Sequence, residues 1–375
     1  MKCEVVIGAN YGDEGKGQTT YDVCRRHEKP IVVMTNGGCQ RGHTVDVGGF
    51  RHIFHHFGSG TPLGCPTYFP ATYFMNPMQY VKEYHELEGY GMRPVAYRSE
   101  KCVMQFPSDA IVNQILEKAR QNTNSEHGSC GCGIWETVVR NKCHPVTVED
   151  FANLNRKQKK CLYNEILNEQ INVRLNNDVR SCDLLEIIQQ DSFIEHFLDD
   201  FDFMHKSSSV LGMSDLLKTN NYDWVVFENA QGLLLDEEYS HDITHSTPSK
   251  TGLGGVSLAI RSSTPGTFDP RKHICYLCVN YVSRTYLTRH GAGTFEEYDS
   301  KIKFEDKTNI PNAWQGTLRF GHFNDVSCEK LKIRTNDDFY KYANDICINS
   351  FKKLVFTHQD QYISRKLIDF GLLAV

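Results

Sequence analysis

The sequence predicts an α/β protein with a large, mainly parallel central sheet, a phosphate loop like a P-loop, and a helical excursion. Short apolar runs typical of buried strands recur along the 375 residues, and the first two runs end in glycine-rich turns. The first of these turns carries a lysine and leads into a helical pattern, and residues 147–218 look helical throughout. Buried strands followed by glycine turns and helices are typical of parallel sheets.

Five apolar runs are the strand candidates. They are, in chain order, residues 5–8, 31–34, 224–227, 274–279 and 354–357. A helix is expected from Thr19, after the first turn. The helical excursion is expected to begin at Thr147, because Thr147 followed by Glu149 and Asp150 is a favourable helix N-terminus. No internal repeat or low-complexity linker divides the chain, so we expect a single domain over residues 1–375.

Composition argues against several classes of function. The 41 basic and 46 acidic side chains give a formal net charge of −5, which argues against sequence-independent binding of nucleic acid. No apolar run approaches the roughly 20 residues that span a bilayer, and the first residues are too polar for a signal peptide. The 14 cysteines are scattered, which favours reduced thiols in a cytoplasm. We therefore expect a soluble, cytoplasmic protein with a pocket for a small, charged ligand.

The turn after the first strand has the composition of a phosphate-binding loop. Gly15 and Gly17 let backbone N–H groups approach an anion, and Lys16 adds a positive charge. The Walker spacing G-x-x-x-x-G-K-[ST] is absent. Asp13 and Glu14 place two carboxylates in this turn instead. Negative charge beside phosphate is costly unless the carboxylate holds a metal ion or accepts a proton in the reaction.

A second glycine loop, G-H-T at residues 42–44, follows the second strand and belongs at the same edge of the sheet. Together the two loops resemble the N-terminal signatures of the adenylosuccinate synthetase family. Three later segments are similar to further signatures of that family, namely FENAQGLLLD at 227–236, YLTRHGAGTF at 286–295 and THQD at 357–360. Members of the family condense IMP with aspartate at the expense of GTP. The resemblance covers essentially the whole chain.

The resemblance implies catalytic roles for the two loops. Asp13 would be the general base and a ligand of Mg²⁺, and His43 would be the acid at the purine 6-oxygen. Lys16 would meet the phosphates, the Gly42 carbonyl would help to hold Mg²⁺, and Thr44 would contact the triphosphate. The residues themselves agree, because a carboxylate in an anion loop needs a proton or a metal ion and imidazole is suited to proton donation. The other triphosphate contacts implied in the first loop are Gly12, Glu14, Gly15, Gly17 and Gln18.

The triphosphate base is expected at residues 357–360, after the last strand. Asp360 would accept hydrogen bonds from guanine N1–H and the 2-amino group, which adenine cannot supply, so GTP is the expected donor. His358 stands where the family has a lysine that packs over the base.

The resemblance also places the acceptor nucleotide and the amino acid. The residues expected around the acceptor nucleotide are Asp13, Gln40, Ser129, Arg140, Gln231 and Thr244. Gln231 offers both a donor and an acceptor to a purine edge. Arg140 matches a family arginine that crosses a dimer interface to the monophosphate, so a homodimer is implied. Arg319, with Thr317 beside it, is the expected reader of the aspartate carboxylates, because a guanidinium binds carboxylates in a bidentate manner.

Two alternatives to an IMP-dependent ligase stay open. One is the phage branch of the family, which adds aspartate to dGMP with GTP or ATP as donor. Its 2-amino substrate would crowd a carboxylate beside N1, and dGMP enzymes resemble this loop with a smaller residue there, so the intact Asp13 favours IMP. The other alternative is a nucleotide-binding regulator without catalytic activity. It would be expected to lose Asp13, Lys16 or His43, and all three are present.

Overall fold

The central sheet of the protein has eight strands, in the order β14-β11-β1-β10-β2-β5-β7-β9. The structure is a computed structural model that describes residues 1–123, 125–175, 183–304, 306, 308–309 and 314–357. Each neighbouring pair in this sheet is parallel. The strands are β1 (Lys2–Gly8), β2 (Pro30–Met34), β5 (Thr67–Phe69), β7 (Ala96–Arg98), β9 (Ser208–Val210), β10 (Trp224–Gly232), β11 (Tyr276–Arg284) and β14 (Ser350–Thr357). The predicted α/β fold with a large parallel sheet is confirmed.

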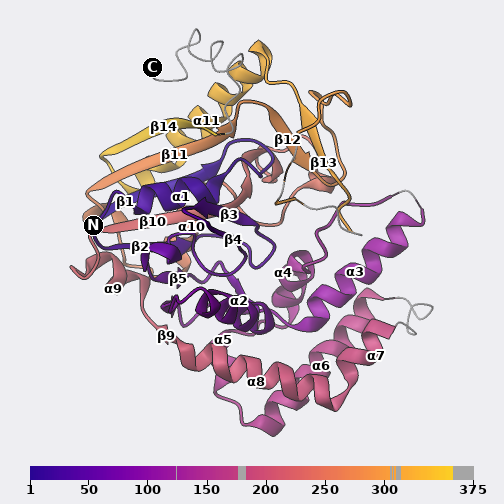
Figure 1. The fold of residues 1–375 in the computed structure, drawn as a ribbon. Coiled ribbons are helices and arrows are strands. Elements are labelled where there is room, and N and C mark those ends of the chain that lie inside the picture. The colour runs from indigo at the N-terminus through magenta and orange to yellow at the C-terminus, as the bar shows by residue number, and fades with distance from the viewer. Residues whose placement is uncertain (124, 176–182, 305, 307, 310–313, 358–375) are drawn as a thin grey trace.

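Helices lie on both sides of this sheet, and short strand pairs lie beyond its carboxyl edge (Figure 1). The helices are α1 (Lys16–Cys24), α2 (Pro77–Gly89), α3 (Pro107–Gln121), α4 (Ile134–Cys143), α5 (Val148–Ala152), α6 (Arg156–Arg174), α7 (Asp183–Gln189), α8 (Asp191–Ser207), α9 (Met213–Lys218), α10 (Leu253–Ser262) and α11 (Asp325–Ile346). The strand pairs are β3 (His43–Val47) with β4 (Phe50–Phe54), β6 (Phe74–Met75) with β8 (Val103–Met104), and β12 (Leu287–His290) with β13 (Leu318–Gly321). In the described part of the chain, no helix is long and apolar enough to cross a membrane.

The five predicted strands are all present, as β1, β2, β10, β11 and β14. The helix predicted from Thr19 begins three residues earlier, at Lys16. Among the described residues of the predicted helical excursion over 147–218, the helices α5 to α9 make up most of the segment, and β9 interrupts them as the outermost strand of the sheet. Each of the three strands at the β9 end of the sheet, β5, β7 and β9, has three residues. Segments that short carry too little alternation to be recognised from sequence.

The start of the excursion follows the predicted capping chemistry. The Thr147 hydroxyl accepts a hydrogen bond from the Asp150 backbone N–H at 3.0 Å, and the Asp150 carboxylate accepts one from the Thr147 N–H at 3.0 Å. Both bonds satisfy N–H groups that a helix start leaves without an intrahelical partner. The helices from α3 to α8 then gather on one side of the molecule, beyond the β9 edge (Figure 1).

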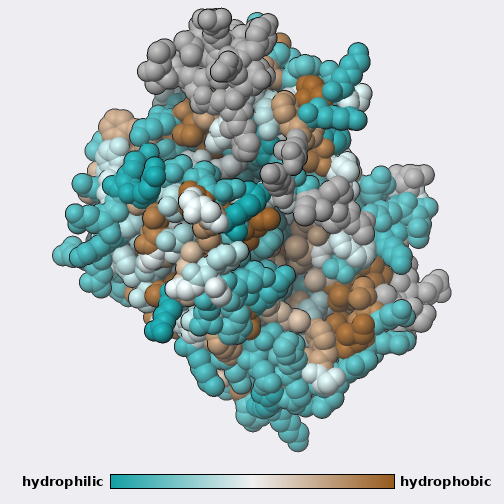
Figure 2. Space-filling model, in the orientation of Figure 1, coloured by the Kyte–Doolittle hydropathy of each residue, from teal (hydrophilic) through white to brown (hydrophobic). Residues whose placement is uncertain are grey.

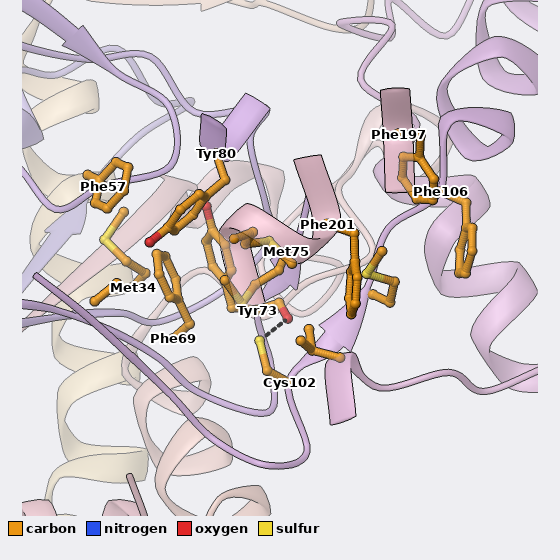
Figure 3. Packing of buried hydrophobic residues seen from close by; sticks show 14 of the residues in the cluster. Met34, Phe57, Phe69, Tyr73, Met75, Tyr80, Cys102, Phe106, Phe197 and Phe201 are labelled. Carbon is orange, nitrogen blue, oxygen red and sulfur yellow. Dashed lines mark hydrogen bonds between the residues drawn. The ribbon is translucent and has the colours of Figure 1, made fainter. Parts of the chain in front are cut away.

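One hydrophobic core runs from the sheet into this helical layer. Met34 on β2 packs with Phe69 on β5, and the same cluster continues through Phe106 to Phe197 and Phe201 on α8 (Figure 3). All five side chains are fully buried. A continuous core favours one domain with a helical excursion over two separate modules. The single domain over residues 1–375 stays a prediction.

A buried carboxylate joins α11 to the start of α10 on the other face of the sheet. Asp338 accepts the Leu253 N–H at 2.9 Å and the hydroxyls of Tyr281 and Tyr239 at 2.8 and 3.1 Å. Burial raises the pKa of Asp338 to about 6, although these three donors favour the charged form. The folded protein therefore holds a proton on Asp338 between its unfolded pKa, about 4, and pH 6.

The Asp338→Asn variant should lose this pH dependence of stability. A pKa that is higher in the folded state contributes stability below pH 4, and that contribution is lost as the pH rises through 6. The free energy of unfolding of the wild type, minus that of Asp338→Asn, should fall by about 2 kcal/mol between pH 4 and pH 7. Urea unfolding at both pH values measures it. Asp345→Asn, at an exposed site on α11, is the control. A difference that does not change with pH would contradict the assignment.

Candidate active site

The carboxyl ends of the central strands open into one cavity of about 1200 Å³. The loops after β1, β2 and β10 line it, together with the ends of β11 and β14. The predicted site residues that line this cavity are Gly12, Asp13, Gly15, Lys16, Gly17, Gln18, Gln40, Gly42, His43, Thr44, Ser129, Gln231 and Thr244. Residues far apart in the sequence therefore meet at a single site, as the order of the strands requires.

The phosphate loop is closed by one of its own carboxylates. Glu14 is buried and accepts the backbone N–H groups of Asn10 and Gly12 at 3.0 and 2.8 Å. Its second oxygen lies 3.2 Å from Lys16 Nζ. A Cβ on Gly8 would lie 2.5 Å from that oxygen, so only glycine fits there. The Glu14 carboxylate therefore does not serve the triphosphate, because its oxygens face into the loop and Glu14 does not line the cavity, and a contact through the Glu14 backbone stays a prediction.

The phosphate loop and the G-H-T loop are in direct contact. A Cβ on Gly17 would lie 2.8 Å from the backbone of both His43 and Thr44. This close approach brings the first turn of α1 against the start of β3. The N-terminus of a helix presents free N–H groups and a partial positive charge, so the phosphates of a nucleotide are favoured here. Lys16, which lines the cavity, adds its ammonium group.

The His43 ring is hydrogen-bonded to a carboxylate on β10. Its Nδ1 lies 2.6 Å from Glu228 Oε1, and Glu228 is fully buried. Glu228 also accepts the Ser59 hydroxyl at 2.5 Å and the Ser59 backbone N–H at 3.0 Å. Because an ionised carboxylate only accepts hydrogen bonds, Nδ1 must carry the proton in this pair.

The ionisation of this pair follows from burial and neighbouring charge. Burial lowers the pKa of His43 to about 4, although Glu228 opposes that shift. Burial alone would raise the pKa of Glu228, but the adjacent His43 and Arg41 hold it below its usual value. The unliganded site therefore contains a neutral imidazole and a charged carboxylate near pH 7.

The polar groups expected around a purine nucleotide reach the cavity from three separate segments of the chain. Gln231 follows β10 with a left-handed backbone, φ +66°. Thr244 lies in a short 3₁₀ helix, Ile243–His245. Gln40 accepts the Gly38 N–H at 2.6 Å through Oε1, while its buried Nε2 has no hydrogen-bond partner among the described residues. A buried donor without a partner is costly, so Nε2 suits an acceptor on a ligand.

The turn that contains Ser129 is fastened to α3. The Ser129 hydroxyl donates to Asn113 Oδ1 at 2.7 Å. The Glu117 carboxylate accepts the Gly128 N–H at 2.7 Å and the Ser129 N–H at 3.3 Å. Ser129 lines the cavity and Glu117 does not. The backbone N–H groups of Gly128 and Ser129 and the Ser129 hydroxyl proton are therefore all bound within the chain, so the hydroxyl would have to exchange Asn113 for a phosphate oxygen.

Arg140 does not take the predicted place at the monophosphate. Its guanidinium is buried, donates to Asp109 at 3.0 Å and to the Met104 carbonyl at 2.6 Å, and packs over the Phe106 ring. A third bond goes to the His144 carbonyl at 3.1 Å. A side chain with these internal partners cannot reach across a dimer interface, so this prediction is corrected.

The two residues predicted to bind aspartate lie outside the cavity lining. Thr317 is exposed at the turn before β13. Arg319 donates to the carbonyls of Gly291 and Gly293 at 2.7 and 3.0 Å. These glycines flank Ala292, which does line the cavity. In this arrangement Arg319 supports the cavity wall, and a role in binding aspartate stays a prediction. His358 and Asp360 lie outside the described residues.

Sequence reasoning missed most of the cations in the cavity. The arginines that line it are Arg41, Arg51, Arg120, Arg284 and Arg289. Arg289 lies within residues 286–295, the segment that is similar to a family signature, but no role was assigned to it from the sequence. Arg284 ends β11, and it is recognised as a site residue only once the parallel pairing of β11 with β1 is known.

The protein ligands proposed for Mg²⁺ fit that ion. Asp13 offers a carboxylate and Gly42 a carbonyl, and both residues line the cavity. Oxygen ligands of this kind suit Mg²⁺, which is commonly held by one or two carboxylates together with phosphates and water. Among the described residues, no three His, Cys, Asp or Glu side chains gather into a metal site. The ion would therefore need the triphosphate as a further ligand.

A sequence model of the adenylosuccinate synthetase family matches residues 5–312 of the chain. The chain belongs to the adenylosuccinate synthetase family. The resemblance inferred from the motifs is thereby confirmed, and with it the assignment to the ligases that form a C–N bond. The adenylosuccinate synthetase of Edwardsiella ictaluri is 30% identical over 351 residues, which are 89% of this chain and 74% of the relative. That of Clostridium botulinum (strain Alaska E43 / Type E3) is 26% identical over 273 residues, 69% of this chain and 59% of the relative.

Two solved structures share the fold of this adenylosuccinate synthetase family member. The fully ligated adenylosuccinate synthetase of Plasmodium falciparum matches with a TM-score of 0.66 at 18% identity, over 85% of this chain and 71% of that one. The succinoaminodeoxyadenylate synthetase of cyanophage S-2L, bound to dGMP and dATP, matches with a TM-score of 0.58 at 14% identity. That match covers 94% of this chain and 92% of the cyanophage chain.

Proposed function

We propose that this protein joins L-aspartate to carbon 6 of the purine of IMP, with GTP as phosphoryl donor and Mg²⁺ as cofactor. The observation that carries the proposal is the meeting of Asp13, Lys16, His43 and Gln231 in one cavity. These side chains are those that the family motifs assign to the base, the phosphates, the acid and the purine. A regulator that had lost the chemistry would not need all four.

The reaction needs activation of a poor leaving group. In the proposed first step, the purine 6-oxygen takes the γ-phosphoryl group of GTP while Asp13 removes the N1 proton. His43 faces the same oxygen, and negative charge developing there would favour the protonated, donating imidazole. In the second step, the aspartate amine displaces phosphate from carbon 6. Bound Mg²⁺ would supply positive charge at the phosphate oxygens, held by Asp13 and the Gly42 carbonyl.

The remaining contacts follow the sequence predictions that the cavity supports. Gln231 would read the purine edge, and Gln40 Nε2 would donate to the acceptor nucleotide. Thr244 would offer its hydroxyl to the ribose phosphate, and the Ser129 hydroxyl would do so after exchanging Asn113 for a phosphate oxygen. Arg319 is retained as the proposed reader of aspartate, and it would have to exchange a glycine carbonyl for a carboxylate. We also propose a cytoplasmic location, since every described cysteine is a free thiol.

A homodimer is proposed from the resemblance to the family. The internal bonds of Arg140 remove the residue on which the prediction first depended. A different feature supports it, because an apolar area on the face shown in Figure 2 lies at the lower right, where Figure 1 shows α3 and its neighbouring helices. Trp135 on α4 is 45% exposed and also lines the cavity, so a partner that covered Trp135 would lie beside the nucleotide.

A second candidate acceptor is dGMP. The observation in its favour is the length of the structural match, because this chain spans 92% of the cyanophage enzyme and 71% of the Plasmodium falciparum enzyme. The intact Asp13 carboxylate in the cavity favours IMP, because a 2-amino group beside N1 would crowd it. The two candidates use the same fold and differ in the acceptor base.

A matrix of acceptors and donors tests the proposal. IMP, dIMP, GMP and dGMP are each incubated with aspartate, Mg²⁺ and either GTP or ATP, and products are identified by mass spectrometry. We expect adenylosuccinate from IMP and GTP. Product from dGMP alone would transfer the assignment to the second candidate. Absence of product from every pair, with nucleotide binding retained, would support a regulator.

A further inference from the structure

Arg284 connects the phosphate loop to the carboxylate of Asp306, and all three line the cavity. It is the last residue of β11 and is 5% exposed. Its Nε donates to the Asp13 carbonyl at 2.5 Å, and its Nη2 lies 2.9 Å from Asp306 Oδ2. Nη1 donates to the Tyr286 hydroxyl at 2.8 Å. Each nitrogen of the guanidinium therefore has a partner, and its contact with the phosphate loop is to the Asp13 backbone.

The Asp13 backbone needs such support. Its φ of +63° lies in the left-handed region, and Asp13 and Gln231 are the two non-glycine residues with positive φ in the described chain. A non-glycine residue held in this region is strained and persists only where its surroundings fix it. Glu14 fixes one side of the turn through the Gly12 N–H. Arg284 fixes the other side with a buried, charge-assisted hydrogen bond, which is stronger than a neutral one.

We propose that Arg284 is the positioning residue of the Asp13 base, and that Asp306 keeps Arg284 in place. The inference depends on the proposed function, which supplies the role of Asp13 as base. The Asp13 carbonyl and its side chain are attached to the same Cα, so a hydrogen bond that holds the carbonyl restricts the Cα and thereby the direction of the carboxylate. A carboxylate that is moved by about 1 Å can lose on the order of 100-fold in rate.

Asp306 is built to hold this arginine. Its Oδ1 accepts the N–H groups of Thr308 and Asn309, both at 2.9 Å, and its Oδ2 accepts Arg284. Burial opposes ionisation, but the Asn309 N–H and the Arg284 guanidinium lower the pKa of Asp306 to about 2. The carboxylate thus stays charged at neutral pH. The Thr308 hydroxyl lies 2.7 Å from the Thr44 hydroxyl, so the Arg284–Asp306 pair lies at the triphosphate end of the cavity.

The test compares kcat with KM in four variants. For Arg284→Gln we expect kcat to fall about 30- to 100-fold, because the Asp13 carboxylate loses its orientation. Each KM and the Kd of GTP should stay within about threefold of wild type, because substrate binding is unchanged. Arg284→Lys keeps the charge and can donate to the Asp13 carbonyl, so it should recover kcat to within about tenfold of wild type. Asp306→Asn should lower kcat about fivefold to tenfold by loosening Arg284. Arg271→Gln, which removes an exposed arginine paired with Asp269, is the matched control and should resemble wild type.

Hydrogen exchange of the phosphate loop gives a second readout that needs no turnover. Amides of residues 12–15 should exchange faster in Arg284→Gln than in wild type and Arg271→Gln. Wild-type kcat in Arg284→Gln, a parallel loss of kcat and nucleotide affinity, or unchanged exchange would each overturn the positioning role. A wild-type protein that makes no product in the acceptor matrix would instead refute the proposed function, whatever the exchange data show.

Discussion

The Asp13→Asn variant should lose nearly all turnover while it still binds GTP. A positioned general base contributes about 10²- to 10⁴-fold to a rate, and loss of a metal ligand adds to this, so we expect kcat to fall by roughly 10³-fold or more. Asparagine is the best replacement here because it tolerates the left-handed backbone of Asp13, φ +63°, better than alanine does. The measurement is product formation under saturating substrates, with GTP affinity determined by calorimetry.

The control for this variant is Asp22→Asn on α1. Asp22 forms an exposed ion pair with Arg25 and does not line the cavity. It should keep wild-type kcat and should unfold at a similar temperature. If Asp13→Asn kept kcat within tenfold of wild type, Asp13 would not be the base, and the proton would have to leave N1 by another route. If Asp13→Asn instead lost GTP binding together with turnover, the carboxylate would serve the triphosphate and not the acceptor.

The chemistry of the two N-terminal loops could be predicted because it is local in the sequence. Asp13 and Lys16 follow the first strand directly, and His43 follows the second after a glycine loop. The parallel order β1-β10-β2 then brings these loops to one edge, together with Gln231 at the end of β10. Strand ends in a parallel sheet share an edge whatever the connections between them, so the site could be assembled without knowledge of the fold in detail.

The failures have a common physical cause. Glu14 and Asp13 are adjacent carboxylates, and the backbone path alone turns one into the loop and the other into the cavity. Arg140 satisfies its charge with Asp109, 31 positions earlier in the chain, and that contact leaves no trace in local sequence. Arg284 needs knowledge that β11 lies beside β1. Long-range pairing of charges decides these three roles, and sequence patterns report only short-range order.

Asn229, which replaces a glycine of the family motif, shows how such a departure can be structural. Its side-chain amide donates to the carbonyls of Thr251 and Gly252 at 2.8 and 2.9 Å, just before α10 begins. The asparagine therefore ties β10 to the start of α10 beneath the purine site. Its presence in the motif is explained without any change in the reacting groups.

The Glu228→Gln variant should lose about 10²- to 10³-fold in kcat with small changes in KM, because it alters the hydrogen-bonding state of His43. Glu228 accepts the Ser59 hydroxyl, the Ser59 N–H and His43 Nδ1. Glutamine can still accept from Ser59, but it then presents its NH₂ group to Nδ1. That arrangement favours a neutral imidazole with an unprotonated Nδ1, and it removes the negative charge that stabilises a protonated imidazole. Steady-state kinetics with the acceptor that the wild type uses will measure the loss.

A double-mutant cycle separates this effect from a general loss of stability. If Glu228 acts through His43, the variant that combines Glu228→Gln with His43→Asn should be no slower than His43→Asn alone. Additive losses would show that Glu228 acts on the reaction independently of the imidazole. The matched control is Glu83→Gln, because Glu83 is also fully buried, lies 3.5 Å from His52 Nε2 and does not line the cavity. Removal of that buried charge should lower the unfolding temperature and leave kcat within a few-fold of wild type, so a large fall in kcat there would mean that any buried carboxylate has this effect.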